Sequence, residues 1–123
     1  MAPAYAVPRM LKRAGLTLQD FDYYEIHEAF AAQVLCTLAA WQDDEYCRTQ
    51  LGLEGALGAI DRAKMNVNGG SLATGHPFAA TGGRIVAGLA KMLAQLDKPA
   101  GTARGLISIC AAGGQGVVAI LER

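Results

Sequence analysis

Two histidines and one cysteine of this chain stand where an apolar segment or a helix meets a turn-forming stretch. His27 opens the run His-Glu-Ala-Phe, His76 is the centre of Gly-His-Pro, and Cys110 opens Cys-Ala-Ala-Gly-Gly. Turns are the places where a rigid scaffold exposes reactive side chains. Because imidazole and thiol groups can exchange protons near neutral pH, the three segments together predict an assembled acid–base site.

Each of these residues also has a purely structural interpretation. His27 follows an apolar segment and could be a satisfied, partly buried histidine. Cys110 could pack as a small hydrophobic residue, as free cysteines usually do, but the glycine-rich turn beside it favours a functional role. Cys36 and Cys47 lack such a context, so we expect both to be structural, with Cys36 on the apolar side of a helix.

The glycine-rich segment 68–83 could bind an anion at a helix N-terminus. It lacks the lysine of a nucleotide-binding loop and the glycine spacing of a dinucleotide-binding fold, so a nucleotide site is not expected. The three cysteines match no metal-ligand spacing, and we expect no metal site. Their odd number favours free thiols in a reducing compartment over a disulfide framework.

Length and composition indicate a single domain spanning residues 1–123. The chain is 52% hydrophobic and 18% charged, which suits one compact core. Its formal net charge is zero and its Lys and Arg residues are scattered, which argues against nucleic acid or an anionic membrane as partner. Charged residues and glycines interrupt every apolar stretch before a membrane-spanning length, and no secretory signal opens the chain. We therefore expect a cytoplasmic protein.

The first half of the chain alternates helix, strand and helix. Residues 3–13 show helical spacing, and Gly15 suits the C-cap of that helix. Residues 21–26 contain Phe, two Tyr and Ile between acidic residues and predict a strand that ends at His27. Residues 28–43 predict a second, mostly buried helix, with Glu28 in its first turn, where an acidic group suits the helix dipole.

The second half is predicted to end in a hairpin. Residues 43–65 give a weak signal, a polar helix and a glycine-spotted excursion over the surface. We interpret Phe30, Trp41 and the methionines as core. The further predicted elements are a short strand at 66–68, a helix at 79–96 with Pro77 in its first turn, and strands at 105–110 and 116–121 joined by a turn at 111–114. This order predicts an α/β layer fold with helices on both faces of the sheet and the catalytic turns at strand ends.

The motifs His-Glu-Ala-Phe-Ala-Ala-Gln, Asn-Val-Asn-Gly-Gly to Gly-His-Pro, and Cys-x-x-Gly-Gly before a final strand resemble the C-terminal domain of the thiolase family. The resemblance covers nearly the whole chain. Most thiolases have Asn where this chain has His27, and the three motifs are similar to the branch that acts on fatty-acyl substrates in β-oxidation. That branch uses CoA to cleave a 3-ketoacyl-CoA into acetyl-CoA and a shortened acyl-CoA, so acyl-CoA and CoA are the implied substrates, with no cofactor.

The resemblance also implies a role for each motif residue. Cys110 is the acid–base thiol that protonates the departing acetyl carbanion, and His76 activates a nucleophilic cysteine and helps bind a thioester oxygen. His27 takes the place of the Asn that orients this oxyanion site. His76 precedes a helix N-terminus, whose dipole disfavours imidazolium and so suits a base. The other implied site residues are the backbone of Ala112 and Gly113 at a second oxyanion hole, and Ala29, Phe30, Gly75 and Pro77 lining the substrate.

The sequence also departs from the family pattern. Family thiolases carry the nucleophilic cysteine on an N-terminal domain and grip CoA with a loop domain, and no cysteine here lies in a matching motif. The family domain begins with a strand at the centre of a five-stranded sheet, so we expect this first strand to be missing. We accordingly expect the isolated chain to be inactive, and to pair with an N-terminal thiolase half or form a homo-oligomer. The alternative is a truncated, non-catalytic module that binds or dimerises with thiolases.

Overall fold

A computed structural model describes all residues of the chain, 1–123. Its centre is a mixed three-stranded sheet. The strands are β1 (Tyr23–Ile26), β2 (Arg104–Ala111) and β3 (Gln115–Glu122), in the order β1-β2-β3. β1 runs parallel to β2, and β2 runs antiparallel to β3. Because β1 pairs directly with β2, the sheet has no open slot between its strands.

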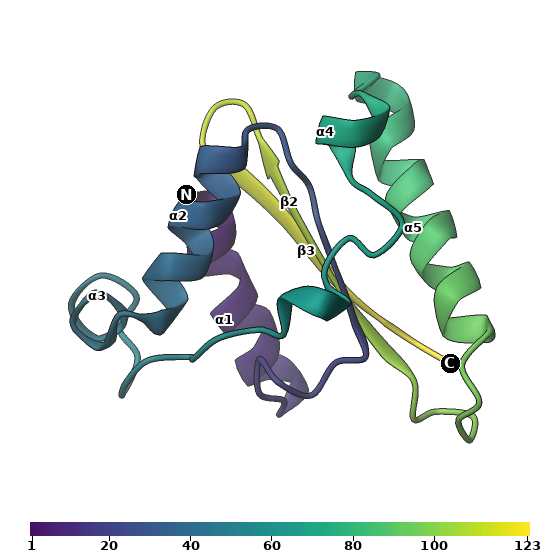
Figure 1. Ribbon diagram of the computed structural model, residues 1–123. Coiled ribbons are helices and arrows are strands. Elements are labelled where there is room, and N and C mark those ends of the chain that lie inside the picture. Colours follow the sequence, from purple (N-terminus) through teal and green to yellow (C-terminus); the bar gives the residue numbers. More distant parts are fainter.

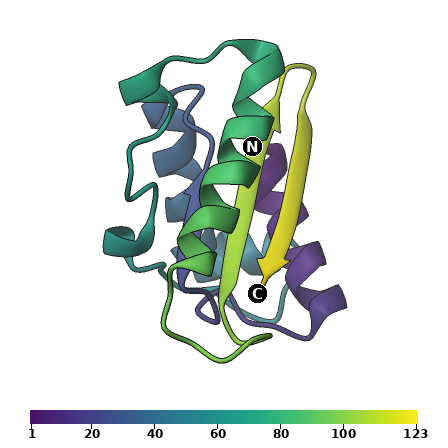
Figure 2. The same cartoon turned by 90° about the vertical axis from the view of Figure 1, so that its right-hand side faces the viewer.

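Helices cover both faces of this sheet, as the sequence predicted. Helices α1 (Ala2–Ala14) and α2 (Ala31–Gln42) lie on one side, and α5 (Phe78–Ala94) lies alone on the other (Figures 1 and 2). The predicted glycine C-cap of the first helix is confirmed, because Gly15 has a φ of 67° and its N–H donates to the carbonyl of Leu11. The remaining helical segments are short: α3 (Asp44–Thr49), a 3₁₀ turn (Arg62–Lys64) and α4 (Ser71–Thr74).

The alternation of side chains along the strands divides the core in two. Leu106 of β2 packs with Tyr24 and Ile26 of β1 in the cluster under α1 and α2. Ile107, one residue further along β2, packs with Ile85 and other residues of α5 in the second cluster. This period of two fixes which face of the sheet every later residue of β2 occupies.

The predicted strand at 66–68 is wrong. Met65 forms a single parallel bridge with Tyr24, and the chain then turns at Asn66, whose φ is 49°. The amide side chain of Asn66 replaces the missing strand: its Oδ1 accepts from the Ile26 N–H at 2.8 Å, and its Nδ2 donates to the Ile26 carbonyl at 2.8 Å. At Ile26 the edge of β1 is therefore satisfied by a side chain instead of a neighbouring strand.

Four predictions about the second helix and its start also need correction. The helix begins at Ala31, so Glu28 lies outside its first turn, and the helix buries one face only. Cys36 is exposed instead of lying on the apolar side, and Phe30 is 73% exposed instead of lying in the core. Trp41 and Cys47 are buried as predicted. The exposed positions follow from the helix geometry, because only the stripe through Val34, Leu38 and Trp41 faces the sheet.

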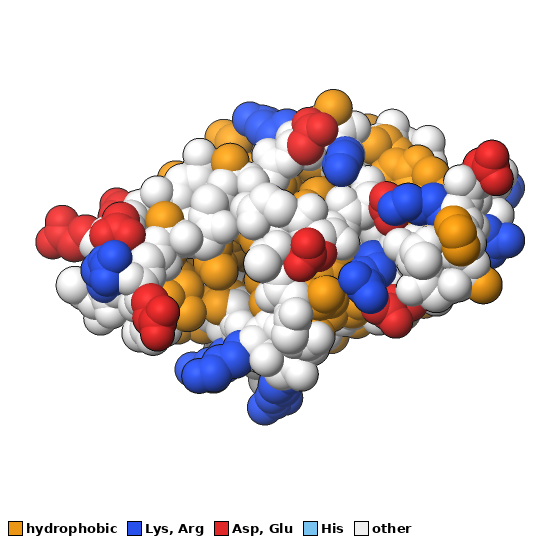
Figure 3. Space-filling model, turned by 90° about the horizontal axis from the view of Figure 1, so that it is seen from below, with side chains coloured by type: hydrophobic (Ala, Val, Ile, Leu, Met, Phe, Trp, Pro, Cys, Tyr) orange, Lys and Arg blue, Asp and Glu red, His pale blue; other side chains and the backbone are white.

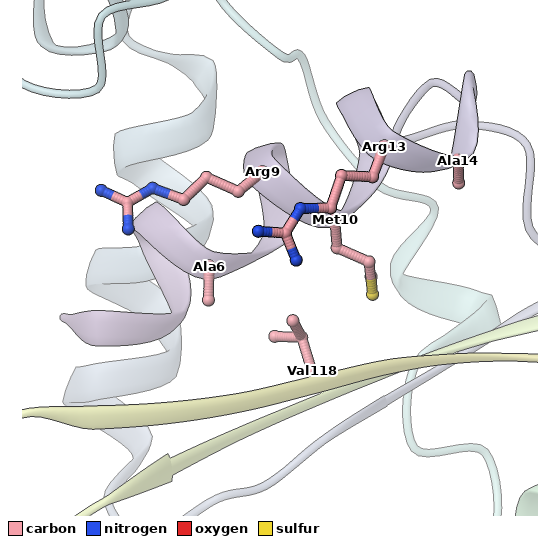
Figure 4. A pocket seen from close by; sticks show the side chains of 6 residues that line it. All are labelled: Ala6, Arg9, Met10, Arg13, Ala14 and Val118. Atoms are coloured by element: carbon pink, nitrogen blue, oxygen red, sulfur yellow. The ribbon is translucent and has the colours of Figure 1, made fainter.

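The end of the molecule opposite the β2–β3 turn carries no patch of a single sign of charge. Figure 3 views the molecule from below Figure 1 and shows Lys, Arg, Asp and Glu interspersed over this end. No helix combines the length and the apolar composition that crossing a membrane requires. A hollow of about 460 Å³ lies between α1 and β3 and contains none of the predicted site residues (Figure 4). It is lined by Ala6, Arg9, Met10, Arg13, Ala14 and Val118.

Candidate functional site

The structure brings the two histidines together at one end of the sheet. The loop after β1, helix α4 and the β2–β3 turn all lie at this end (Figure 1). His27 directly follows β1, and its backbone N–H donates to the Ser108 carbonyl of β2 at 2.9 Å. His76 belongs to the loop before α5, and its ring centroid lies 4.2 Å from that of His27, with an angle of 52° between the rings.

The two imidazoles differ in their exposure. His27 is 3% exposed, whereas His76 lies at the surface with the ring of Phe78 beside it, at a centroid distance of 4.9 Å. A ligand can therefore reach His76 directly, whereas the ring of His27 is almost closed to solvent. This layering is the arrangement expected of a group that meets a substrate and a second group that supports it from behind.

Each ring is held by a hydroxyl group. His27 Nδ1 lies 3.0 Å from the Oγ of Ser71, in α4, and His76 Nδ1 lies 2.6 Å from the Oγ1 of Thr81, in the first turn of α5. Thr81 is buried, and Ser71 also accepts a hydrogen bond from Arg84 of α5. In both rings the Nδ1 atom is therefore engaged, which leaves the two Nε2 atoms as the groups available for chemistry.

The surroundings of His27 lower the pKa of its imidazole below the ordinary value. Burial is the main cause, followed by the positive charges that His76 and Arg84 bring near it. Glu28 acts in the opposite direction and is outweighed. His27 is consequently held as a neutral ring at neutral pH, a form that can donate one hydrogen bond and accept another.

The carboxylate of Glu28 fastens the loop that carries Ser71. Its Oε1 accepts from Asn66 Nδ2 at 2.8 Å, and its Oε2 accepts from the Leu72 N–H in α4 at 3.1 Å. Glu28 thus interacts with the start of α4, not with the helix that follows it in the sequence. Its approach requires glycine at position 70, where a Cβ atom would lie 2.3 Å from Glu28 Oε2.

Cys110 lies on the other face of the sheet from the histidines. It shares the alternation of Leu106, on the side of α1 and α2, whereas His27 contacts α4 and the loop before α5. Its cross-strand partner Gly116 confirms this, because a Cβ there would meet the backbone of Ala2 and Pro3 in α1. Cys110 is half-buried and forms no hydrogen bond to either imidazole. The structure therefore pairs the two imidazoles, and a site shared by all three residues stays a prediction.

The remaining predicted site residues lie in the loops at this end of the sheet. Ala112 and Gly113 form the exposed β2–β3 turn, where Gly113 has a φ of 78° and Ala112 has no positive φ, so alanine is sterically acceptable there. The predicted lining residues follow or flank the histidines in the chain. Ala29 is half-buried, and the other three are exposed: Phe30, Gly75 and Pro77.

Sequence reasoning missed the polar residues that support the pair. Ser71, Thr81 and Arg84 come from segments far from His27 in the sequence or carry no motif of their own. Glu25 of β1 is also buried on the α5 side, where burial raises the pKa of its carboxyl despite the opposing charge of Arg84. No group of three or more His, Cys, Asp or Glu side chains is placed to hold a metal ion.

Comparison with known proteins identifies the group to which this arrangement is related. The whole chain, residues 1–123, matches the model of the family described as "Thiolase, C-terminal domain". A 3-ketoacyl-CoA thiolase of Pectobacterium atrosepticum is 50% identical over 122 residues, and one of Shewanella baltica is 48% identical over the same length. The alignments cover 99% of this chain but 27% of each relative, so the chain spans about a quarter of their length.

Solved structures give the same result. An acetyl-CoA acetyltransferase of Syntrophomonas wolfei superposes with a TM-score of 0.72 at 36% identity, over 96% of this chain and 26% of that one. The dimeric peroxisomal thiolase of Saccharomyces cerevisiae superposes with a TM-score of 0.70 at 39% identity, over 99% of this chain and 26% of the yeast protein.

Proposed function

Since the chain belongs to the thiolase family, as a C-terminal domain, we propose that it supplies the acid–base and oxyanion half of a site for acyl transfer to and from CoA. The reaction proposed is the thiolytic cleavage of a 3-ketoacyl-CoA to acetyl-CoA and a shortened acyl-CoA in fatty-acid β-oxidation. The observation that carries the proposal is the pair of contacting imidazoles at the strand ends, each held by a hydroxyl at Nδ1.

The chemistry requires groups of this kind. Cleaving a carbon–carbon bond next to a carbonyl needs an attacking thiolate, donors for the developing oxyanion, and an acid that protonates the departing carbanion. His76 is the accessible ring and is proposed to activate the thiol and contact a thioester oxygen. His27, buried and neutral, is proposed to support the oxyanion site from behind. Cys110 is proposed to protonate the acetyl carbanion.

The nucleophilic thiol is proposed to come from another polypeptide segment, either an N-terminal thiolase half or a partner subunit. Three large apolar side chains around the histidines support a protein partner at this end: Phe30 is 73%, Leu72 is 63% and Phe78 is 88% exposed. Exposed apolar groups gathered around a polar site are typical of a surface that another chain covers. The 123-residue chain alone is therefore proposed to be inactive.

A second candidate function is favoured by the position of Cys110. In the alternation of β2, Cys110 falls on the face that carries α1 and α2, whereas His27 contacts α4 and the ring of His76. The alternative is a non-catalytic module that uses its exposed apolar residues to bind or dimerise with thiolases. The effect of removing the Cys110 thiol on cleavage distinguishes the two functions, because thiolysis requires that thiol and the non-catalytic module does not.

The experiment is a chimera in which this chain replaces the matching 27% of the Pectobacterium atrosepticum 3-ketoacyl-CoA thiolase. Cleavage of acetoacetyl-CoA by CoA in the purified chimera, lost on Cys110→Ala by about 10²-fold or more, supports the proposed function. Cys36→Ala is the matched control, because Cys36 is an exposed free thiol that belongs to none of the three motifs. A folded chimera that transfers acyl groups to its nucleophile but cleaves no 3-ketoacyl-CoA supports the non-catalytic module.

A further inference from the structure

Each of the two hydroxyls that hold the imidazoles has a second partner, which restricts where its single proton can point. A serine or threonine hydroxyl donates once and can accept twice, whereas a neutral imidazole donates from one nitrogen and accepts at the other. The identity of the second partner therefore determines whether Nδ1 of each ring is a donor or an acceptor. For this pair the two partners are of opposite type.

The second partner of Ser71 is a guanidinium. Arg84 Nη2 donates to Ser71 Oγ at 3.2 Å, and a guanidinium has no acceptor to offer in return. Ser71 is 6% exposed, and its other hydrogen-bond partner is His27 Nδ1 at 3.0 Å. The hydroxyl proton satisfies a hydrogen bond only by pointing at Nδ1. His27 Nδ1 is thus an acceptor, and its Nε2 carries the proton.

The second partner of Thr81 is a carbonyl. Thr81 Oγ1 donates to the Pro77 carbonyl, one helical turn back, at 3.2 Å, and a carbonyl can only accept. With its proton engaged there, Oγ1 accepts from His76 Nδ1 at 2.6 Å. His76 Nδ1 is thus a donor, and its Nε2 carries a lone pair.

We propose that Ser71 and Thr81 are positioning residues that hold His27 and His76 in opposite tautomers, His27 with a protonated Nε2 and His76 with an unprotonated Nε2. The two rings, whose centroids are 4.2 Å apart, then offer one donor and one base. The use of this polarity in catalysis rests on the proposed function: the Nε2 lone pair of His76 removes the thiol proton, and the Nε2–H of His27 supports the oxyanion. The tautomers themselves do not depend on that function.

The test is the ¹⁵N NMR spectrum of the histidine rings in the 123-residue chain, with no substrate or partner. It is recorded about two pH units above the ordinary imidazole pKa of about 6.5, where protonated and unprotonated ring nitrogens are well resolved. We expect the proton on Nε2 of His27 and on Nδ1 of His76. The same protonated nitrogen on both rings overturns the proposal without any variant.

Variants then test which hydroxyl acts on which ring. Thr81→Val keeps the shape but removes the hydroxyl, and it should shift the Nδ1–H to Nε2–H ratio of His76 by about fivefold or more, the ratio that one net hydrogen bond sets. Thr81→Ser should restore the original ratio. Thr74→Val is the matched control, because Thr74 Oγ1 donates to the Gly70 carbonyl in the same way but forms no hydrogen bond with an imidazole. An unchanged His76 ratio in Thr81→Val overturns the role of Thr81.

Ser71→Ala tests the other half of the proposal and should change the ratio of His27 while leaving His76 near its original ratio. An unchanged His27 ratio overturns the role of Ser71. These results are separable from the proposed function. A chimera without thiolysis whose rings hold opposite tautomers refutes the function alone, and an active chimera whose rings share one tautomer refutes the inference alone.

Discussion

Asn66 is the residue whose loss should most weaken the strand end that carries His27. Its side chain makes three hydrogen bonds of 2.8 Å each: it accepts from the Ile26 N–H, and it donates to the Ile26 carbonyl and to Glu28 Oε1. Ile26 is 4% exposed, so water cannot readily replace the two bonds to its backbone. Asn66→Ala removes all three bonds and places alanine at a φ of 49°.

The size of the effect follows from these contacts. Leaving the buried backbone groups of Ile26 unpaired costs about 1–3 kcal/mol, and the lost bond to the Glu28 carboxylate adds about 1 kcal/mol or more. The left-handed backbone costs alanine a further 1–2 kcal/mol or so. We therefore expect Asn66→Ala to lower the free energy of unfolding by about 3–6 kcal/mol. Asn66→Gly should recover only the backbone part, because glycine accepts this φ but makes none of the bonds.

The assay is urea unfolding at neutral pH, together with amide hydrogen exchange of Ile26. Asn68→Ala is the matched control, two residues away: Asn68 is exposed, and its side chain contacts only the weak acceptor Met92 Sδ. We expect this control to cost less than about 1 kcal/mol. An Asn66→Ala variant as stable as the control, with unchanged exchange at Ile26, refutes the reasoning that a side chain completes the edge of β1.

Three further predictions concern packing and charge. Gly105→Ala should lower the free energy of unfolding, measured in urea, by about 1–3 kcal/mol, because the added Cβ would lie 2.5 Å from Leu89 Cδ1. The control Gly83→Ala, whose Cβ would face open space on α5, should not lower it. Glu25→Gln should raise the free energy of unfolding at neutral pH, because burial raises the pKa of Glu25. The stability that the native carboxyl contributes is complete below pH 4.5 and is lost as the pH rises through the higher pKa of the folded state. A variant that is less stable at neutral pH contradicts this. His76→Ala should raise the pKa of His27 towards its ordinary value in an NMR titration, because the pKa of His27 is lowered by burial and then by the charge of His76; an unchanged or lower midpoint counts against the pairing.

Local sequence signals predicted the elements that depend on local physics. The C-cap at Gly15 and the hairpin of β2 and β3 follow from a glycine at a left-handed position and from two apolar runs around a glycine turn. The strand expected at 66–68 failed because Asn66 satisfies β1 with its side chain, which no local pattern distinguishes from a strand. Phe30 and Cys36 failed for a related reason, since helical spacing alone does not say which stripe of an apolar helix meets the sheet.

The candidate site was predictable in part. The motifs indicated both histidines, and the structure places them in contact. Ser71, Thr81 and Arg84 could not be found from one sequence, because hydroxyl and guanidinium groups are common and their contacts depend on how α4 and α5 pack. The position of Cys110 could not be predicted either, because the face that it occupies depends on which residues of β2 enter each core cluster.

Thiolysis by the chimera of this chain with the Pectobacterium atrosepticum thiolase, measured with and without the Cys110 thiol, tests the central claim most directly. The account predicts CoA-dependent cleavage of acetoacetyl-CoA that falls by about 10²-fold or more with Cys110→Ala and is unchanged with Cys36→Ala. It also predicts that Cys110→Ala still allows acyl transfer to the nucleophile from a simple acyl-CoA, because that step needs no carbanion protonation. Equal cleavage by the unsubstituted and Cys110→Ala chimeras would contradict the claim that this chain supplies the acid–base half of the site.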